Sequence, residues 1–440
     1  MQQPEAGSAA AGSASAAGRA PAVPGILTAG QLHATARAIA ADQQADGSIG
    51  WPDGHVDAWN HVECAMALSV CGLRREARRA YAWLADAQQP DGSWPVQTAG
   101  GPDGERTTES NHAAYCAVGV WHELLVTGDE DFAARMWPVV RAAVEFAIGL
   151  QAPRGEIIWR RHEDGTPDSY ALLTGSSSMY HSLRCAIALA ERLAQPQPRW
   201  EVAAALLGHA VACHGEAFAD KSRFSMDWYY PVLAGPVRGM AAERLLKSGW
   251  DTFVVPGLGV RCVSDEPWVT AAETCELAIA LAAIGHRDEA FELFEQIQFL
   301  RADDGSYWTG WQFANGKHFP HERSTWTAAA VILAADVLAA EALAAEALAS
   351  GTAAAPSALG GSMAGGSMAG GSMAGGSMAG GSMAGGSMAG EAPACTGAAA
   401  IFRDAAAGPG VWRPANPAAC GCPPAGDDGS DSVPGPLQDV

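Results

Sequence analysis

Six stretches of the chain are rich in Ala and Leu and apolar on nearly every face, and we interpret each as preceded by a short polar and aromatic cluster. A helix that is apolar all round is a buried one. Amphipathic stretches with charged faces, such as residues 74–88 and 130–150, lie between the apolar ones. The pattern therefore predicts inner helices that alternate with outer helices. The predicted inner helices are residues 60–70, 112–125, 179–193, 237–246, 271–284 and 325–338.

The clusters recur at a regular interval along the chain. One residue from each cluster, at positions 57, 109, 176, 227, 273 and 322, gives spacings of 46 to 67 residues. Repeated helical hairpins stack side by side and bury a common core. Six of them predict an all-α fold, an (α/α)6 toroid or barrel, in which all inner helices begin at the same end. The polar clusters then converge on a single mouth.

Composition divides the chain into four parts. Residues 1–26 hold mostly Ala, Gly, Ser and Pro and are predicted to be a disordered N-terminal segment, and residues 27–350 are the predicted toroid domain. Residues 351–390 are a low-complexity linker that contains six copies of Gly-Ser-Met-Ala-Gly, and residues 391–440 are a disordered, acidic Pro/Gly-rich tail. Small residues at that density do not offset the entropy lost on ordering.

The chain is acidic, with 27 Lys and Arg against 48 Asp and Glu and a formal net charge of -21 at pH 7. This balance argues against nucleic acid or anionic lipid as a partner, because both attract basic surfaces. No run of about 18 apolar residues is found, so no transmembrane segment is expected. Residues 1–26 lack a basic start followed by an apolar stretch, so we expect no secretory signal and predict a cytoplasmic protein.

The ten cysteines do not indicate a metal site or a disulfide framework. Seven are spread singly through apolar stretches, where we expect buried free thiols that act as small hydrophobic side chains. Cys420 and Cys422 are close together, but no second cysteine pair or His cluster accompanies them. A metal site there has weak support.

Residues 43–48, 88–94 and 301–308 are versions of one turn motif that contains Asp-Gly-Ser. Asp-Gly makes a tight turn at the end of an outer helix, where Gly accepts a positive φ. We interpret these turns as structural joints between one hairpin and the next.

The fullest copy is Tyr-Ala-Trp-Leu-Ala-Asp-Ala-Gln-Gln-Pro-Asp-Gly-Ser-Trp at residues 81–94. It resembles the Gln-Trp repeats of the terpenoid cyclase and protein prenyltransferase superfamily. This resemblance implies an α/α toroid that acts on an isoprenoid or isoprenoid-linked substrate.

A second resemblance competes with the first. Residues 127–132 (Thr-Gly-Asp-Glu-Asp-Phe), then Trp137-Pro138, and finally residues 146–151 with 155–159, look like the outer hairpin of six-hairpin glycoside hydrolases. This resemblance implies a carbohydrate-active enzyme with a glycan substrate. The two superfamilies share toroid geometry, so both imply the same fold.

The acidic motifs of the cyclases are missing. No Asp-x-Asp-Asp is present, and Asp129-Glu-Asp131 opens an amphipathic helix, where we expect it to cap that helix. Asp303-Asp304 continues as Gly-Ser-Tyr and does not fit the Asp-Asp-x-x-Asp that holds magnesium diphosphate. An Asp, Cys and His trio for zinc cannot be placed. No cofactor is therefore identified, since neither Mg2+ nor Zn2+ is supported by a motif, and no metal ligand is predicted.

Carboxylates at the starts of the inner helices are the candidate catalytic groups. Like charges confined together and partly desolvated raise some of their pKa values, which provides an acid and a base at one pH. Such an acid can protonate an alkene or epoxide in a cyclisation, or a glycosidic oxygen while a second carboxylate activates water. Capping of a helix is the competing interpretation for each residue alone. The candidates are Asp57, Glu109, Asp227, Glu273 and Glu322.

Aromatic and polar residues of the same clusters are candidates for substrate binding. Aromatic faces stabilise a carbocation, but they equally stack on sugar rings or pack the toroid. For the histidines, core residues bonded to neighbouring turns are commoner than a metal trio. The candidates are Trp59, Asn60, His61, Glu63, Asn111, His112, His181, Trp228, Tyr229, Tyr230, Trp268, Trp308, Trp311, Arg323 and Trp326.

Three functions fit these observations. The turn motif favours a prenyltransferase-like or terpenoid cyclase-like enzyme that acts on an isoprenoid small molecule, with the mouth carboxylates as acid and base. The polar mouth favours a six-hairpin glycoside hydrolase, because a pocket for a polyene is mostly apolar. A non-catalytic, ligand-binding toroid is the third hypothesis. The sequence-based prediction is the first of these, and the glycoside hydrolase is its alternative.

Overall fold

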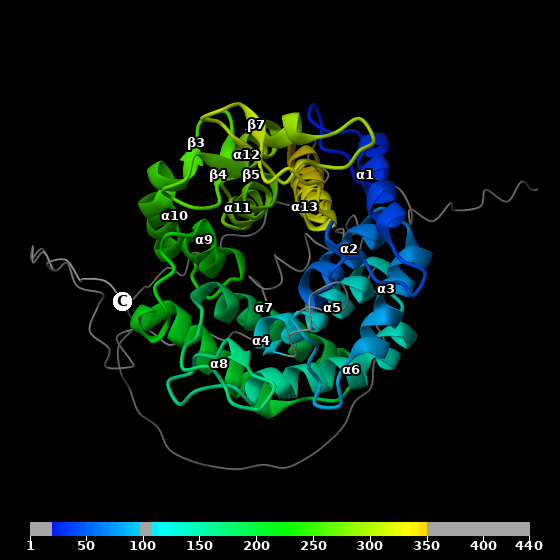
Figure 1. Ribbon diagram of the computed structural model, residues 1–440, viewed down its shortest axis with the longest axis vertical. Coiled ribbons are helices and arrows are strands. Elements are labelled where there is room, and N and C mark those ends of the chain that lie inside the picture. The colour runs from blue at the N-terminus through cyan, green and yellow to red at the C-terminus, as the bar shows by residue number, and fades with distance from the viewer. Residues whose placement is uncertain (1–19, 97–106, 350–440) are drawn as a thin grey trace, which may run out of the picture.

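The computed structural model describes residues 20–96 and 107–349, which form a closed ring of helices (Figure 1). The predicted linker and tail, with Cys420 and Cys422, lie outside the described residues. At the other end, Ala20 and Val23 are buried against the core. Packed structure therefore begins upstream of residue 27.

Inner helices line the ring, and each packs against the next, with the last returning to the first. Their residues are buried on nearly all sides because each helix has neighbours on both flanks and an outer helix behind it. The predicted (α/α)6 toroid is confirmed. In chain order the inner helices are α2 (Ala58–Val70), α5 (Cys116–Thr127) with the short α4 (Ser110–Ala114) ahead of it, α7 (Leu173–Arg192), α9 (Ser225–Leu233), α11 (Ala271–Ala283) and α13 (Thr325–Ala349).

Outer helices surround this ring, and each packs on an inner helix. Their amphipathic sequences explain the position, because in α3 the buried residues Ala77, Ala80, Tyr81 and Leu84 fall on one face. The outer helix α1 packs on α13, which brings the first helix beside the last. The outer helices are α1 (Ala29–Asp42), α3 (Arg74–Ala87), α6 (Glu130–Ile148), α8 (Pro198–Cys213), α10 (Met240–Phe253) and α12 (Arg287–Gln296), with two single turns, η1 (Gly215–Ala217) and η2 (Ile297–Leu300).

The fourth inner helix differs from the prediction. The inner helix is α9 at residues 225–233, so the cluster at 227–230 lies inside the helix rather than ahead of it. The stretch 237–246, predicted to be buried, instead leads into the outer helix α10, which buries only one face. Three consecutive aromatic residues give α9 its buried surface, since each buries about 150–250 Å². The cluster at 176–181 likewise lies inside α7.

Short antiparallel strands, which were not predicted, lie at the mouth end of the ring. They occupy segments that lead into inner helices, so they build the wall around the helix starts. One pair is β1 (Thr108–Glu109) with β2 (Arg160–Arg161). The other sheet has the order β3 (Val254–Val255), β4 (Gly259–Arg261), β5 (Trp268–Thr270), β6 (Gly310–Gln312) and β7 (Lys317–His318).

One helix corrects the prediction that no apolar run is long enough to cross a membrane. Residues Thr325–Glu346 of α13 pass that test by length and composition. Their most apolar part is 72% buried inside the ring, and the central helix of a packed domain has the same composition. This is weak evidence for a membrane span, and contact with α2 and α11 accounts for the apolar surface.

The turn motif fastens one outer helix to another. Gln43 follows α1, and its side-chain N–H groups donate to Gly47 O of its own turn and to Glu76 O on α3, both at 3.0 Å. Gln88, after α3, does the same with Gly92 O and with Val139 O on α6. The interpretation of these turns as joints therefore agrees with the contacts they make.

A further copy of the joint, not recognised in the sequence, follows α6. Gln151 donates to Gly155 O and to Ala203 O on α8, each at 2.9 Å. A Cβ atom on Gly155 would lie 2.4 Å from Leu206 O, and the residue has a φ of +110°. Only glycine permits both that backbone conformation and that close approach.

The last joint closes the ring. Arg301 replaces the glutamine and donates to Gln31 O on α1 at 3.5 Å. Gly305, with a φ of +93°, packs directly on Ala34 of the same helix. The turn after the final outer helix thus reaches the first outer helix, and the N- and C-terminal hairpins become neighbours.

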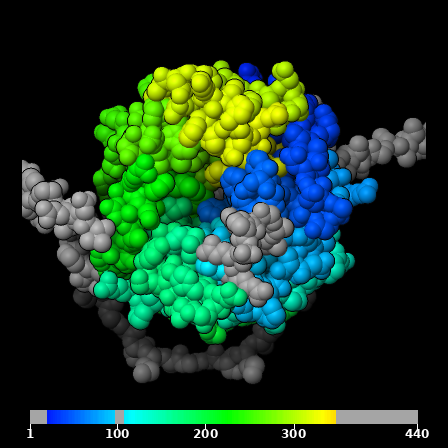
Figure 2. Space-filling model, in the orientation of Figure 1, coloured from blue at the N-terminus to red at the C-terminus, as the bar shows by residue number. Residues whose placement is uncertain are grey.

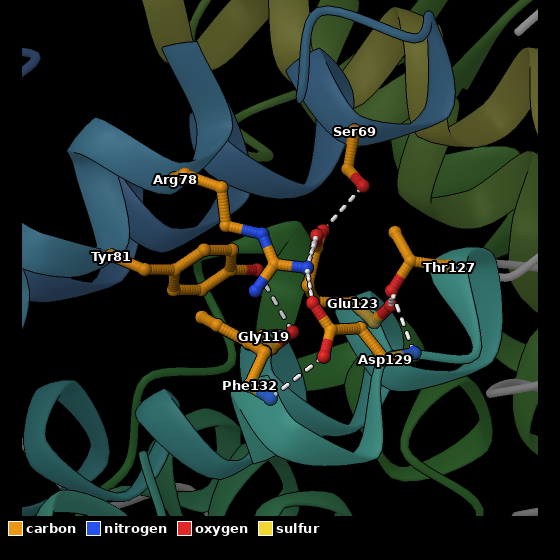
Figure 3. Close-up of polar contacts among 8 residues, drawn as sticks. All are labelled: Ser69, Arg78, Tyr81, Gly119, Glu123, Thr127, Asp129 and Phe132. Atoms are coloured by element: carbon orange, nitrogen blue, oxygen red, sulfur yellow. Dashed lines mark hydrogen bonds and ion pairs between the residues drawn. The ribbon is translucent and has the colours of Figure 1, made fainter. Parts of the chain in front are cut away.

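A charged cluster joins the first two hairpins at the end of the inner helices away from the mouth (Figure 3). Arg78 on α3 binds the buried Glu123 on α5 at 3.0 Å and Asp129 at 2.9 Å. Ser69, near the end of α2, donates to the other Glu123 oxygen. Asp129 accepts a hydrogen bond from Phe132 N at 2.8 Å, so the predicted capping role of this residue is confirmed.

We expect Arg78→Met to lower the free energy of unfolding by about 2–4 kcal/mol, because it leaves the Glu123 carboxylate buried without its cation. Urea denaturation followed by circular dichroism measures the change. The exposed Arg75 on the same helix provides the matched control, and Arg75→Met should shift the value by less than about 0.5 kcal/mol. Equal stabilities of the two variants would contradict a structural role for the cluster.

Candidate active site

Aromatic side chains from opposite helices meet at the centre of the ring. Trp59 on α2 and Tyr230 on α9 face one another across the toroid, and their ring centroids are 6.1 Å apart. Tyr115, between α4 and α5, lies 5.5 Å from Trp59. These side chains close the centre of the ring, and we refer to them as the floor of the mouth.

Two buried carboxyl groups lie at this floor. Glu63 Oε1 accepts hydrogen bonds from Trp59 Nε1 at 2.8 Å and from Tyr115 Oη at 3.1 Å. Glu276 accepts from Tyr230 Oη at 2.7 Å and from Tyr229 Oη. Both acids line a cavity of about 30 Å³, close to the volume of one water molecule, at the point where the inner helices converge.

The two floor carboxyls hold protons more tightly than ordinary glutamates. Burial raises the pKa of Glu63 to about 7, with hydrogen bonds from Trp59 and Tyr115 opposing the rise and the charge of Asp57 adding to it. Burial, and then the charge of Glu63, raises the pKa of Glu276 well above its usual value. Like charges this close in a dry site disfavour double ionisation. The pair therefore carries a proton at neutral pH.

Asp57 lies at the start of α2 and has a different set of partners. Its Oδ1 accepts from Asn60 N at 2.9 Å, and its Oδ2 accepts from Trp51 Nε1 at 2.7 Å and from Asn60 Nδ2 at 2.5 Å. All three partners are donors, so they suit an ionised carboxylate, which only accepts. Asp57 is thus both the N-cap of α2, as the capping interpretation required, and a fixed carboxylate at the mouth.

Glu273 lies in the first turn of α11 and is 4% exposed. Its Oε2 atom is buried and has no hydrogen-bond partner among residues 20–96 and 107–349. The Cys262 thiol lies beside the carboxyl, and burial followed by the charge of Glu273 raises the pKa of that thiol. A buried carboxyl oxygen without a partner costs about 1–3 kcal/mol. Such an atom marks a position where a ligand can supply the missing contact.

The other three predicted catalytic carboxylates are occupied by protein groups or lie at the rim. Glu109 binds Arg160 at 3.0 Å and His112 at 3.4 Å. Asp227 accepts from Thr174 N at 3.2 Å and Thr174 Oγ1 at 2.6 Å, at the start of α7, and burial raises its pKa. Glu322 is half-buried, with Thr309 Oγ1 3.4 Å away.

Aromatic residues form the wall of the mouth on the side of α13 and the five-stranded sheet. The Trp326 ring, in the first turn of α13, lies 5.9 Å from that of Trp51. Trp268 packs on Phe319 at 4.5 Å. The wall is completed by Trp308, stacked 4.3 Å from His318, and by Trp311, 5.2 Å from the same histidine, with the Arg323 guanidinium 5.3 Å from the Trp308 ring centre.

Two predicted binding residues face away from the mouth. The His61 Nε2–H donates to Ala80 O on α3, and its Nδ1 accepts from Ile49 N, so this histidine holds α2 to the outer layer. Trp228 donates to Leu245 O and stacks on Phe253, both of α10. Helical periodicity explains this result, because adjacent residues of a helix point in different directions.

The remaining predicted residues lie inside the ring or at its floor. His112 packs edge-on against Trp59, with centroids 5.9 Å apart. Asn111 packs beside Gly175 at the start of α7, and its buried Oδ1 has no hydrogen-bond partner in the described part of the chain. His181 lines the floor cavity, and burial lowers its pKa to about 4, which keeps it neutral.

Sequence reasoning missed four residues of the site: Trp51, Tyr115, Cys262 and Glu276. Glu276 gave a signal, since it is an acid inside an otherwise apolar stretch and lies one helical turn after Glu273. Trp51 and Cys262 gave none, because they belong to segments that only the tertiary structure brings to the mouth. No group of three or more His, Cys, Asp or Glu residues placed to hold a metal occurs among the described residues.

The sequence resembles a characterised enzyme over most of its length. It is 54% identical over 316 residues to the MMP endo-(1,4)-3-O-methyl-alpha-D-mannosidase of Mycolicibacterium hassiacum. The aligned residues cover 72% of this chain and 88% of that enzyme. The chain belongs to the family of that mannosidase. It is therefore a glycoside hydrolase, although no family model matches it.

Solved structures support the same fold at low sequence identity. A D-mannose isomerase has a TM-score of 0.55 and 11% identity, covering 70% of this chain and 96% of its own. A mannosylglycerate hydrolase from Thermus thermophilus has a TM-score of 0.52 and 13% identity, and the match covers 68% of this chain and 99% of that enzyme. A rhamnosidase from Klebsiella oxytoca has a TM-score of 0.51 and 18% identity, covering 72% of this chain, which spans only 65% of that enzyme.

These relatives correct the functional prediction. The prenyltransferase or terpenoid cyclase interpretation is wrong, and the glycoside hydrolase alternative is supported. The Gln-Trp-like turns caused the error, because they are joints between outer helices and their geometry is independent of the reaction in the mouth.

We expect the melting temperature of the glycoside hydrolase to fall between pH 6.5 and 8.5. Glu63 keeps its proton in the folded state up to a pKa of about 7, but an unfolded glutamate loses it near 4.5. Stability is therefore lost as the pH rises through the pKa of Glu63 in the folded state. Glu276, whose pKa is also raised, extends this loss of stability to higher pH. The buried His61, whose pKa is lowered to about 4, acts oppositely and only below pH 6.5.

Glu63→Gln should reduce this fall by about 2 °C or more, because it removes one acid and the charge that acts on Glu276. Scanning calorimetry at pH 6.5, 7.5 and 8.5 measures the effect. Glu295→Gln, on the exposed face of α12, is the control and should keep the wild-type slope. A wild-type melting temperature that does not change over this range would count against a protonated pair.

Proposed function

We propose that the chain hydrolyses internal α-1,4 bonds in chains of mannose that carry 3-O-methyl groups, with Glu273 as the general acid and Asp57 as the general base. The buried, unpartnered Glu273 Oε2 atom at the mouth carries this assignment. The substrate class is that of the Mycolicibacterium hassiacum relative. The proposal adds the residues and the course of the reaction.

The partners of each carboxyl group support these roles. Asp57 accepts hydrogen bonds from three donors, which hold its two oxygens in place for the role of general base. Glu273 has an oxygen that no described protein group meets, so it can direct a proton to the oxygen of a glycosidic bond. Glu109 is paired with Arg160, so its Oε1 atom is already engaged by a protein group. Glu63 and Glu276 lie in the floor, where they line a small cavity of about 30 Å³.

The reaction is a single displacement. Asp57 removes a proton from a water molecule, whose oxygen attacks the anomeric carbon, while Glu273 gives its proton to the departing glycosidic oxygen. The C–O bond breaks, and the sugar on one side leaves with a new anomeric hydroxyl group. Proton release by Glu273 and proton uptake by Asp57 balance, and bulk water restores both groups.

The positions of the two helices favour inversion of the anomeric carbon. α2 and α11 are not neighbours in the ring, because α13 lies between them. The axes of two packed helices are about 8–10 Å apart. In a ring of six helices, two helices separated by one other, as α2 and α11 are, then have axes roughly 14–17 Å apart. An axis separation of this size favours room between the two carboxyl groups for the attacking water of an inverting enzyme.

The tryptophan wall fits a methylated sugar. Trp51 and Trp326 lie side by side next to Asp57 and present apolar surface in an otherwise polar mouth. Burial of one methyl group contributes about 0.8 kcal/mol. We therefore expect kcat/KM to be several-fold higher for the 3-O-methylated chain than for unmethylated α-1,4-mannose chains of equal length.

Hydrolysis of a 3-O-methylmannose oligosaccharide, followed by mass spectrometry and by proton NMR of the new anomeric centre, tests the proposal. We expect internal cleavage and an initial β-anomer, the outcome of inversion. Asp57→Asn and Glu273→Gln should each lower kcat by about 10²–10⁴-fold, with a melting temperature close to that of the wild type for Glu273→Gln.

Glu295→Gln is the control and should keep wild-type kcat. Asp227→Asn serves as the comparison within the mouth, and it should lower kcat less than the two proposed catalytic variants. Absence of cleavage by the wild-type protein, or kcat within threefold of wild type in both catalytic variants, would refute the proposal.

A further inference from the structure

A large open groove lies at the side of the mouth where the ring closes. It lies between the C-terminal half of α1, residues 44–56 and residues 304–325 (Figure 2, where the yellow surface adjoins the blue one). Its volume is about 1350 Å³, which exceeds the roughly 300–1,000 Å³ of a site for one small molecule. We refer to it as the α1 groove, and the space suits an extended ligand.

The α1 groove reaches the proposed catalytic base. Trp51 lines the groove, and the same side chain donates its Nε1–H to Asp57 Oδ2 at 2.7 Å. Thr325, the first residue of α13, also lines it and donates to Gly50 O at 3.0 Å. Trp51 and Thr325 therefore place the groove beside Asp57, and a chain cleaved at Asp57 can extend toward it.

The charges of the α1 groove favour a neutral ligand. Its lining carries the acids Asp42, Asp46, Asp304 and Glu322 against the bases Arg37 and Arg323, so the formal balance is 2 - 4 = -2. Repulsion of like charge disfavours a phosphate or other anion. The acids and arginines, with the half-buried Trp51 and Trp308, offer the mixture of hydrogen-bonding groups and ring faces that a sugar chain can use.

One pair of lining residues is already arranged for this role. Arg323 binds Asp304 at 2.8 Å, and its guanidinium lies 5.3 Å from the ring centre of Trp308. The guanidinium lies over the face of the Trp308 ring, on which His318 also stacks. Hydroxyl groups of a sugar can then bond to the charged pair.

We propose that the α1 groove binds the sugar units of the substrate that extend beyond the cleaved bond on the Asp57 side, so that it selects long neutral glycans over short ones. The inference rests on the proposed function for the position of the cleaved bond. It adds a binding site built from α1, which the mechanism does not use, and it gives a physical reason for cleavage within a chain.

A tryptophan introduced at Ala41 tests the site. Ala41 is exposed on α1 and lines the groove, so Ala41→Trp fills the space without disturbing the core. We expect kcat/KM for a long 3-O-methylmannose oligosaccharide to fall at least tenfold, while the value for the shortest cleaved oligosaccharide changes less than twofold. Val202→Trp, at a 61% exposed position of α8 across the ring, is the matched control and should alter neither value.

A binding measurement separates failure of this inference from failure of the proposed function. In the Glu273→Gln background, isothermal titration calorimetry with the same long oligosaccharide should give a dissociation constant at least tenfold weaker after Ala41→Trp. Equal affinity with and without the substitution overturns the groove assignment, even if hydrolysis proceeds as proposed. If no hydrolysis is found but the affinity falls, the groove assignment stands as glycan binding and the catalytic proposal fails.

A second variant probes the chemistry rather than the space. Arg37→Ala removes an exposed arginine from the lining. We expect it to weaken binding of the long neutral oligosaccharide at least threefold while the melting temperature stays unchanged. Tighter binding of an anionic oligosaccharide than of the neutral one by the wild-type protein would contradict the charge argument.

Discussion

The hydrogen bond from a turn side chain to the backbone of the next outer helix is the contact on which the ring depends. It recurs from Gln43, Gln88 and Gln151, and Arg301 makes the closing version with α1. The adjoining glycines let the turn lie against helix backbone at distances that no side chain permits. The four joints have the same direction, so the hairpins that they link are added in the same orientation. The inner helices of those hairpins then begin at one end.

That common end gives the same residue type several different chemical states. Glu63 and Glu276 hold a proton because they are buried beside each other. Glu109 is neutralised by Arg160, Asp57 is surrounded by donors, and Glu273 keeps an oxygen without a partner in the described chain. An acid and a base that work at one pH need this kind of difference. In the mouth this difference arises because the six inner helices surround each carboxyl group with different side chains.

Much of the fold was predictable from the sequence, and part of the site was. The stretches that are apolar on all sides predicted most of the inner helices. α9 was not predicted at its actual position, because its buried surface comes from Trp228, Tyr229 and Tyr230 and not from Ala and Leu. Asp57 and Glu273 were predicted as mouth acids from their positions at helix starts. His61 was assigned to the mouth too, yet it bonds to α3, since its direction depends on the helical phase. The reaction was predicted wrongly because the turn motif reports how hairpins join and carries no information on catalysis.

The sequence by itself determined the number of hairpins and their alternation of inner and outer helices. These follow from hydrophobic periodicity and from glycine turns, which act over a few residues. Tertiary structure alone decided which acid pairs with which partner: Glu63 with Tyr115, Glu109 with Arg160, and Asp57 with Trp51. It also decided that α1 and the last turn meet and leave a groove beside the mouth. Most of these contacts join residues far apart in the chain, and their strength depends on burial and distance, which no local pattern encodes.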